Sequence, residues 1–342
     1  MAEPFVSPIP VPKVFPWQQG VLQQLQIAWS AERFPHALLL QGAEGLGKQH
    51  LAAWLAAAVL CDNSKPTLRV CGACASCLLI NAHSHPDLLW VAPEESKQQI
   101  SVEQVRAATA RLTQTSYRQG YKVAVIEPAH LMTASAANSL LKTLEEPTPR
   151  SALILVTSQP SSLLPTVRSR CQKIVVQRPQ PSEALAWLQA ETGVVAGPQL
   201  LEFAGRAPLR AVELAQGRFE QLDSDMQRAV SQLASGGTDV TQVAAEWAKD
   251  GLIERLNWLD LWLTSTARTL IGGTADLFTF PARSAHLPSL PPTLNISALY
   301  SLVDQIRALK AQLARTALQR ELAVEAVLIP LLQMLTPAST GR

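Results

Sequence analysis

Short apolar runs alternate with helical patterns over the first half of the chain. Five runs rich in Leu, Val and Ile are His36–Gln41, Asp87–Ala92, Lys122–Glu127, Ala152–Thr157 and Gln172–Gln177. Continuous apolar runs of this length are typical of strands that are buried on both faces. Such strands, when they alternate with helices, predict a parallel sheet with helices packed on both sides.

Four stretches between these runs have a helical pattern. They are Gln18–Arg33, Lys48–Cys61, Ser101–Gln119 and Thr133–Glu146. The third opens with a capping box, formed by Ser101 and Gln104, and the fourth ends where Pro147 stops the helix.

No strand pattern recurs in the second half. Short helical segments separated by Gly and Pro run from Pro181 to Gly217. Longer helices are predicted over Phe219–Ala234, over Val240–Ile271 with breaks, and over Ile296–Leu335 with a break near Thr316; a Pro-rich segment at 280–293 separates the last two. The sequence therefore predicts an α/β domain over residues 1–178, a small helical domain over 179–219 and a helical bundle over 220–342.

Composition narrows the class of protein. The 342 residues are 47% hydrophobic and 16% charged, which is typical of a globular chain. The net charge of +2 is low for a protein that binds nucleic acid through its own surface. The apolar run Leu51–Cys61 is far shorter than the roughly 20 residues of a membrane span, and the first residues do not resemble a secretory signal. We expect a cytoplasmic protein without membrane contact.

The stretch "GAEGLGKQ" follows the first predicted strand. Gly42, Gly47 and Lys48 match the phosphate-binding pattern G-x-x-x-x-G-K-[ST], with Gly45 inside the loop, and a strand before it and a helix after it are the expected context. Gln49 stands where the pattern needs a hydroxyl to hold Mg²⁺, which argues against tight Mg·ATP binding. A glycine-rich turn with an exposed lysine is the alternative.

The run "VAVIEPAHLM" has the position of the strand that supplies catalytic carboxylates in P-loop ATPases. Glu127 aligns with the metal-binding carboxylate and Pro128 with the residue that activates water. Proline offers neither a side-chain acceptor nor a backbone N–H. Hydrolysis at this chain's own site is therefore not expected, and an ordinary strand with one terminal carboxylate leads to the same expectation.

Four of the five cysteines cluster in "CDNSKPTLRVCGACASC". Cys61, Cys71, Cys74 and Cys77 have the short spacing of a tetrahedral Zn²⁺ site, and four protein ligands leave no open position, so the metal would be structural. Unrelated free cysteines are the alternative, and the nearby His83 and His85 are possible substitute ligands.

Several motifs together resemble bacterial clamp-loader subunits of the AAA+ class. They are "HALLLQGAEGLGK", the Cys cluster followed by "HPD", "NSLLKTLEEP", "LVTSQPSSLLPTVRSRC" and "GRAPLRA", all within about residues 15–215. The resemblance implies a RecA-like AAA+ domain with a parallel five-stranded sheet and a zinc module, then a small helical lid and a C-terminal helical collar that oligomerises into a five-membered ring.

The resemblance also implies a role, that of a stator that does not hydrolyse ATP. Arg170 in "SRC" matches a trans-acting arginine finger for a neighbour's ATP, although two solvated arginines, Arg168 and Arg170, would be the plain interpretation. Thr157 matches sensor 1, Arg210 matches sensor 2, and the four cysteines match zinc ligands. The implied partners are gamma/tau ATPase subunits and a delta subunit, with the sliding clamp and primer-template DNA reached through the complex.

Two other functions stay open at this point. An ATP-hydrolysing motor subunit of the same complex would share these motifs, but Gln49 and Pro128 argue against it. A zinc-containing DNA-binding module is disfavoured by the near-neutral charge. Because Lys48 is retained, residual nucleotide binding stays open as well.

Overall fold

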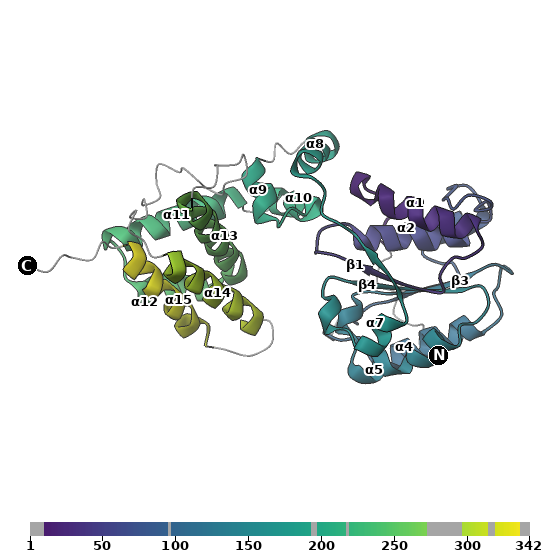
Figure 1. Cartoon of the computed structure of the whole chain (residues 1–342). Helices are drawn as coiled ribbons and strands as arrows, with labels where there is room; N and C mark the ends of the chain where they lie inside the picture. The colour runs from purple at the N-terminus through teal and green to yellow at the C-terminus, as the bar shows by residue number, and fades with distance from the viewer. Residues whose placement is uncertain are drawn as a thin grey trace, which may run out of the picture. The chain divides into compact units, whose positions relative to one another are not determined.

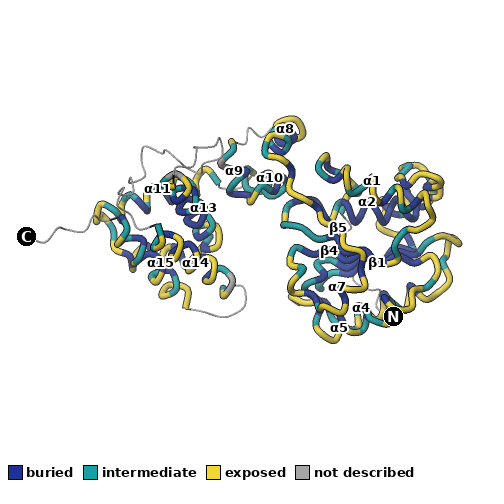
Figure 2. Tube along the Cα trace, viewed as in Figure 1, coloured by how far each residue is buried: buried dark blue, intermediate teal, exposed yellow. Residues whose placement is uncertain are grey.

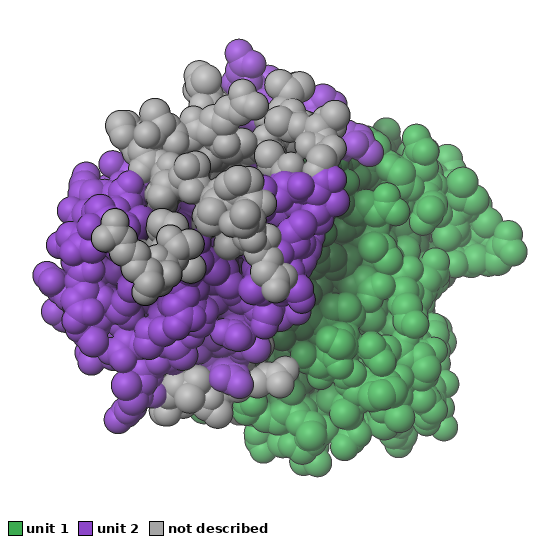
Figure 3. All heavy atoms as spheres, turned by 60° about the vertical axis from the view of Figure 1, so that its left-hand side comes forward, with its two compact units in different colours: residues 1–179 green, residues 180–342 purple. Residues whose placement is uncertain are grey.

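The chain folds into two compact units, and the boundary between them follows residue 179. The computed structural model describes residues 10–94, 97–192, 197–216, 219–271, 296–313 and 319–335. Unit 1 is Met1–Pro179 and unit 2 is Gln180–Arg342, shown in separate colours in Figure 3. Each unit has a hydrophobic core of its own.

Unit 1 is built on a parallel five-stranded sheet. Its strands are β1 (Ala37–Gln41), β2 (Leu88–Val91), β3 (Lys122–Ile126), β4 (Ser151–Thr157) and β5 (Gln172–Val175). Their order is β2-β3-β4-β1-β5, and each neighbouring pair is parallel. This confirms the predicted parallel five-stranded sheet. Because β4 lies between β1 and β3, the carboxyl ends of these three strands meet at one edge.

Helices cover both faces of this sheet (Figure 1). On one side lie α1 (Gln19–Ser30) and α2 (Lys48–Leu60), and on the other lie α4 (Val102–Thr113), α5 (Ala134–Ser139), α6 (Leu141–Glu145) and α7 (Pro165–Ser169). Successive strand residues point to opposite faces, and Leu39, Ala124 and Leu155 belong to the cluster that packs against α4 and α5. Figure 2 shows the central strands buried, which explains why the sequence gives continuous apolar runs here.

The predicted helix Ser101–Gln119 was too long. The capping box at Ser101 forms as expected, but α4 ends at Thr113. The reason is the buried carboxylate of Asp87, which accepts hydrogen bonds from the backbone N–H groups of Tyr117 and Arg118 at 3.0 and 3.1 Å. A helix continued to residue 119 would lose these bonds, because its N–H groups would point to carbonyls four residues back.

The predicted helix Thr133–Glu146 is two short helices. Thr133 caps α5 by accepting from the backbone N–H of Ala136, and the chain changes direction at Leu140 before α6 begins. Leu140 and Leu144 are both buried under the sheet. The break therefore lets both short helices turn apolar side chains to the same core.

Unit 2 is entirely helical in its described residues. Its helices are α8 (Pro181–Thr192), α9 (Pro198–Phe203), α10 (Pro208–Gln216), α11 (Phe219–Ser235), α12 (Val240–Lys249), α13 (Leu252–Leu270), α14 (Ile296–Leu313) and α15 (Arg320–Leu335). The predicted break within 240–271 falls at Gly251, whose φ of 64° favours glycine. The Pro-rich segment 280–293 and Thr316 lie outside the described residues.

The core of unit 2 joins the long helices. Trp247 and Trp258 are fully buried in it, and Phe203 of the short helix α9 belongs to the same cluster. Asp260 links α13 to α14 by accepting hydrogen bonds from Arg307 at 3.0 Å and Lys310 at 2.7 Å. The division of this unit into a lid and a collar stays a prediction. Among the described helices, none has the length and apolarity needed to cross a bilayer.

Candidate functional site

The glycine loop connects β1 to α2 at the carboxyl edge of the sheet. Gly45 and Gly47 both have φ of 74°, in the left-handed region that favours glycine. At Gly42 a Cβ atom would lie 2.5 Å from the carbonyl oxygen of Val176. The three glycines are therefore required by backbone conformation and close approach, and they give the loop the shape that a phosphate cradle needs.

Lys48 begins α2 and is folded back into the loop. Its side chain is buried, and Nζ donates a hydrogen bond to the carbonyl oxygen of Ala43 at 2.7 Å. Burial lowers the pKa of Lys48, and the nearby carboxyl groups of Glu44 and Glu127 oppose that shift. Gln49 is exposed on the next position of α2. The loop thus retains a cation suited to phosphate and lacks the hydroxyl that would hold Mg²⁺.

Three further polar residues meet this loop at the strand ends. Glu127 directly follows β3, Thr157 ends β4, and His130 Nδ1 lies 3.1 Å from Thr157 Oγ1. Burial raises the pKa of Glu127 to about 7, while the charge of Lys48 acts in the opposite direction. A carboxyl group with this pKa is partly protonated near neutral pH when no cation is bound beside it.

His130 is a residue that sequence reasoning missed. It lies in the 3-10 turn η2 (Ala129–Leu131), and its pKa is lowered by burial, with the charge of Glu44 raising it and that of Lys48 lowering it further. The available signal was a polar side chain four residues after the end of a buried strand. After Glu127, the turn carries Pro128 and His130 and no second carboxylate. This turn therefore offers no carboxylate that could activate water beside Glu127.

An N-terminal segment, Phe15–Gln18, packs behind the glycine loop. We call it the aromatic strap. The carbonyl oxygen of Leu46 accepts from Trp17 Nε1 at 3.0 Å and from Gln18 Nε2 at 2.9 Å, and Gln18 Nε2 also donates to the Gly47 carbonyl at 3.1 Å. Phe15 stacks on Trp17, with ring centroids 5.1 Å apart. The strap therefore provides donors for two loop carbonyls, those of Leu46 and Gly47, and no pattern in the sequence predicted these contacts.

Arg170 lies at the end of α7 on the surface of unit 1. Its guanidinium pairs with Glu145 at 2.7 Å and donates to the carbonyl oxygen of Thr166 at 3.0 Å, and its side chain is 37% exposed. Arg168 instead turns inward to the carbonyl oxygen of Pro160 at 3.3 Å. The two arginines that the sequence places together therefore differ, and Arg170 is the one that points its charge to the surface.

Arg210 lies in α10 of unit 2. The other candidate nucleotide-binding residues, Lys48, Glu127 and Thr157, all belong to unit 1. Because Arg210 belongs to the other unit, no contact described here relates it to them. Its sensor role stays a prediction.

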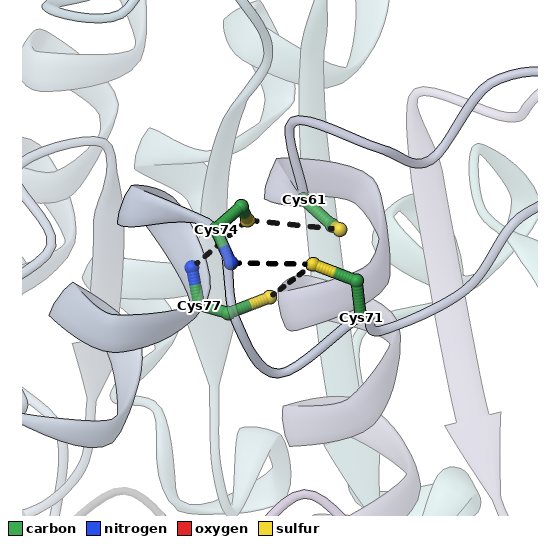
Figure 4. Close-up of side chains that lie close together, drawn as sticks. All are labelled: Cys61, Cys71, Cys74 and Cys77. Carbon is green, nitrogen blue, oxygen red and sulfur yellow. Dashed lines mark hydrogen bonds between the residues drawn. The ribbon is translucent and has the colours of Figure 1, made fainter.

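The four clustered cysteines face one another at the end of α2 (Figure 4). Cys61 follows α2, and Cys74 and Cys77 belong to the start of α3 (Ala75–Asn81), for which Cys74 is the N-cap. The four Sγ atoms all lie within 4.8 Å of one another. The Cys61–Cys74 and Cys71–Cys77 sulfur pairs are each 3.9 Å apart.

These distances fit a tetrahedral zinc site. Zn–S bonds of about 2.3 Å place sulfur atoms about 3.8 Å apart at tetrahedral angles. Backbone N–H groups near Ala73 and Cys74 lower the pKa of Cys71 to about 6, whereas burial raises that of Cys77 to about 12. A bound dication would deprotonate both thiols. His85 is not in the cluster, since its Nδ1 accepts from the backbone N–H of Asp87 at 3.1 Å.

Comparison with known proteins points to one family. The family model described as DNA polymerase III, delta subunit, matches residues 17–180, and the model described as DNA polymerase III, delta subunit, C terminal, matches residues 219–333. DNA polymerase III subunit delta' of Pseudomonas aeruginosa is 36% identical over 259 residues, covering 75% of this chain and 77% of the relative.

Two further relatives place the chain within that family. DNA polymerase III subunit delta' of Escherichia coli is 30% identical over 327 residues, covering 94% of this chain and 96% of the relative. DNA polymerase III subunit gamma/tau of Mycobacterium bovis is 33% identical over 153 residues, covering 45% of this chain and 26% of the relative. Because the delta' matches extend over both units, the chain belongs to the DNA polymerase III delta' subunit family.

Proposed function

We propose that this chain is a non-hydrolysing stator subunit of the bacterial clamp loader, acting in the cytoplasm during DNA replication. It supplies Arg170 in trans to ATP held by a neighbouring subunit and so helps to load the sliding clamp onto primed DNA. The observation that carries the proposal is the surface position of Arg170 on a chain whose own phosphate loop lacks the parts needed for hydrolysis.

The residues of the chain's own site support the proposal that it does not hydrolyse ATP. Gln49 replaces the Mg²⁺-holding hydroxyl, and Pro128 replaces the residue that orients water. Lys48 is retained beside a loop that holds its shape, and Thr157 is retained at the end of β4, but ATP in this site has no chemistry to undergo.

The contacts of Arg170 support its proposed role as an arginine finger. Glu145 holds the guanidinium ready in the ground state, with Nε to Oε1 at 2.9 Å. An exposed ion pair of this kind contributes about 0–1 kcal/mol, so its exchange for a phosphate on a neighbour is not opposed by a large cost. Arginine suits this task because its planar fork binds phosphate oxygens in a bidentate manner.

The proposed partners follow from the family. They are the gamma/tau ATPase subunits and the delta subunit, with the clamp and primer-template DNA engaged through the assembled complex. Zinc on Cys61, Cys71, Cys74 and Cys77 is structural in this proposal, since four protein ligands leave no open position. Arg210 acts from unit 2 as the sensor 2 residue.

The test of the finger is Arg170→Ala in the reassembled clamp loader. We expect DNA- and clamp-stimulated ATP turnover at the adjoining site to fall by about 10³-fold or more, because that is the range for loss of an arginine finger. Arg170→Lys keeps the charge without the fork and should recover little. Arg111→Ala, an exposed arginine on α4, is the matched control. Unchanged turnover in Arg170→Ala would remove the finger from the proposal.

The proposal that the chain does not hydrolyse ATP is tested by measuring ATP hydrolysis by the purified chain alone. We expect no turnover above that of Lys48→Ala, which controls for contaminating ATPase. Turnover that disappears in Lys48→Ala would instead show a motor subunit with an unexpected group that activates water, and the interpretation of Pro128 would be wrong.

A further inference from the structure

Exposed cations gather around the cysteine cluster of unit 1. Lys65 and Arg69 lie in the loop between Cys61 and Cys71, Arg118 lies in the turn that follows α4, and Arg150 directly precedes β4. All four side chains are exposed. Three segments far apart in the sequence thus contribute positive charge at the end of the sheet where β3 and β4 begin.

Direct contacts show that these segments are neighbours. Arg69 Nε donates to the carbonyl oxygen of Asn63 at 3.0 Å, and Arg118 pairs with Asp62 at 3.1 Å. Arg150 donates to the carbonyl oxygen of Gln119 at 3.1 Å. A continuous path of contacts therefore runs from the cysteine loop through the turn at 116–120 to the start of β4.

The charge of this region is unbalanced. Among its residues named above, only Asp62 carries an exposed carboxylate, and this carboxylate is already paired with Arg118. The carboxylate of Asp87 lies buried below, where it accepts from Ser116, Tyr117 and Arg118. Glu32 and Arg33, which follow α1 nearby, cancel each other. The excess is local, and it is consistent with a net charge of only +2 for the whole chain.

An exposed aromatic ring lies on the same turn as Arg118. Tyr117 is 80% exposed, which is unusual for so large a side chain, and Arg118 is the next residue. The turn that carries the ring is fixed, because the backbone N–H groups of Tyr117 and Arg118 are both held by Asp87. The ring is therefore presented to solvent on a fixed backbone.

We propose that Lys65, Arg69, Tyr117, Arg118 and Arg150, named here the basic turn surface, bind single-stranded nucleic acid. The four cations suit successive phosphates, and the exposed ring suits stacking with a base, which is how proteins bind single strands without reading sequence. An acidic protein segment would use the cations and would have no need of the ring. This inference goes beyond the stator role and does not depend on Arg170.

The cysteine cluster contributes to this surface by shaping it. Cys61 and Cys71 bracket the loop that carries Lys65 and Arg69, and Asp62, next to Cys61, is bound by both Ser76 and Arg118. Metal bound to the four thiolates would fix the ends of this loop. Chelation should therefore weaken nucleic-acid binding through the positions of the two cations.

The experiment is fluorescence anisotropy of a fluorescein-labelled dT20 strand with the purified full-length chain over a series of salt concentrations. Three phosphate contacts, made by the cations that no described carboxylate engages, predict a slope of log K against log salt of about −2.1, since Arg118 is already paired with Asp62. Arg69→Ala or Arg150→Ala should each reduce that slope by about 0.7. Tyr117→Ala should weaken binding at least about fivefold with the slope unchanged, and Tyr117→Phe should restore it.

The control variant is Arg228→Ala on the exposed face of α11 in unit 2, which should bind as the wild type does. Thermal unfolding of each variant confirms that the fold is intact. Binding that is absent, or that is unchanged in Arg69→Ala and Arg150→Ala, would overturn the proposal. Competition by poly-glutamate as strong as by dT20, with no effect of Tyr117→Ala, would assign the surface to an acidic protein and would overturn it as well.

Discussion

Replacing Gly47 by alanine tests how the aromatic strap supports the phosphate loop. Gly47 has φ of 74°, where an L side chain is strained. A Cβ atom there would lie 2.4 Å from Phe15 Cε2 and 3.2 Å from Gln18 Nε2. Phe15 is only 2% exposed and is enclosed by Trp17 and His50, so its ring cannot move away freely. The substitution thus combines backbone strain with a steric clash.

The two effects have separate magnitudes. Left-handed conformation costs an alanine about 1–2 kcal/mol, and the lower entropy of the unfolded alanine chain offsets about 0.4–1 kcal/mol of that. Overpacking a filled site adds about 1–3 kcal/mol. We therefore expect Gly47→Ala to lower the free energy of unfolding of unit 1 by about 1–4 kcal/mol.

Gly72→Ala is the matched control in the same unit. Gly72 has φ of 75°, and a Cβ atom at this position would meet nothing within 4 Å. The control therefore carries the strain without the clash. Hydrogen exchange of peptides from β3 and β4, in the core of unit 1, reports the free energy of opening for Gly47→Ala, and exchange of peptides from 61–81 as well as β3 and β4 reports it for Gly72→Ala.

A double-mutant cycle isolates the contact with the strap. In a Phe15→Ala background the space beside Gly47 is open, so Gly47→Ala should cost no more than Gly72→Ala does. The coupling between positions 15 and 47 should then be about 1–3 kcal/mol. Equal costs for Gly47→Ala and Gly72→Ala in the wild-type background would refute the idea that the strap packs tightly on the loop.

Two further predictions concern metal and pH. A chelator that removes the zinc proposed for the cysteine cluster should increase hydrogen exchange in residues 61–81 and leave β3 and β4 protected, because unit 1 has a core of its own. Complete cooperative unfolding of the unit would contradict this. Burial raises the pKa of Glu127 from 4.5 to about 7, so the folded unit binds more protons than the unfolded chain between these values. Stability from the protonated carboxyl is therefore fully present below pH 4.5 and is lost as pH rises through about 7. Glu127→Gln should remove this decline, and equal pH profiles for the variant and the wild type would show that Glu127 is not buried as described.

The sequence by itself determined much of unit 1. The five apolar runs became the five strands, because strands buried on both faces leave a continuous apolar signal. The glycines at 42, 45 and 47 marked the tight loop between β1 and α2, because few other residues tolerate their backbone positions. The spacing of the cysteines indicated one cluster, because short spacings already restrict where four thiols can lie.

Other features of unit 1 were decided by tertiary structure alone. The end of α4 at Thr113 depends on Asp87, which precedes it by more than 20 residues and captures the turn at 117–118. The strap behind Leu46 and the approach of His130 to Thr157 likewise join residues far apart in the chain. Periodicity reports which face of an element is buried, and it carries no information on which distant group will satisfy a given N–H or carbonyl.

The two arginines after β4 show the same division. The sequence placed Arg168 and Arg170 two residues apart and could not distinguish them except by resemblance. Only the fold turns Arg168 to the Pro160 carbonyl and Arg170 to Glu145 at the surface, because the short helix α7 presents its successive side chains in different directions. The sequence determined that a cation was available here, and the packing of α6 against α7 decided which of the two arginines solvent can reach.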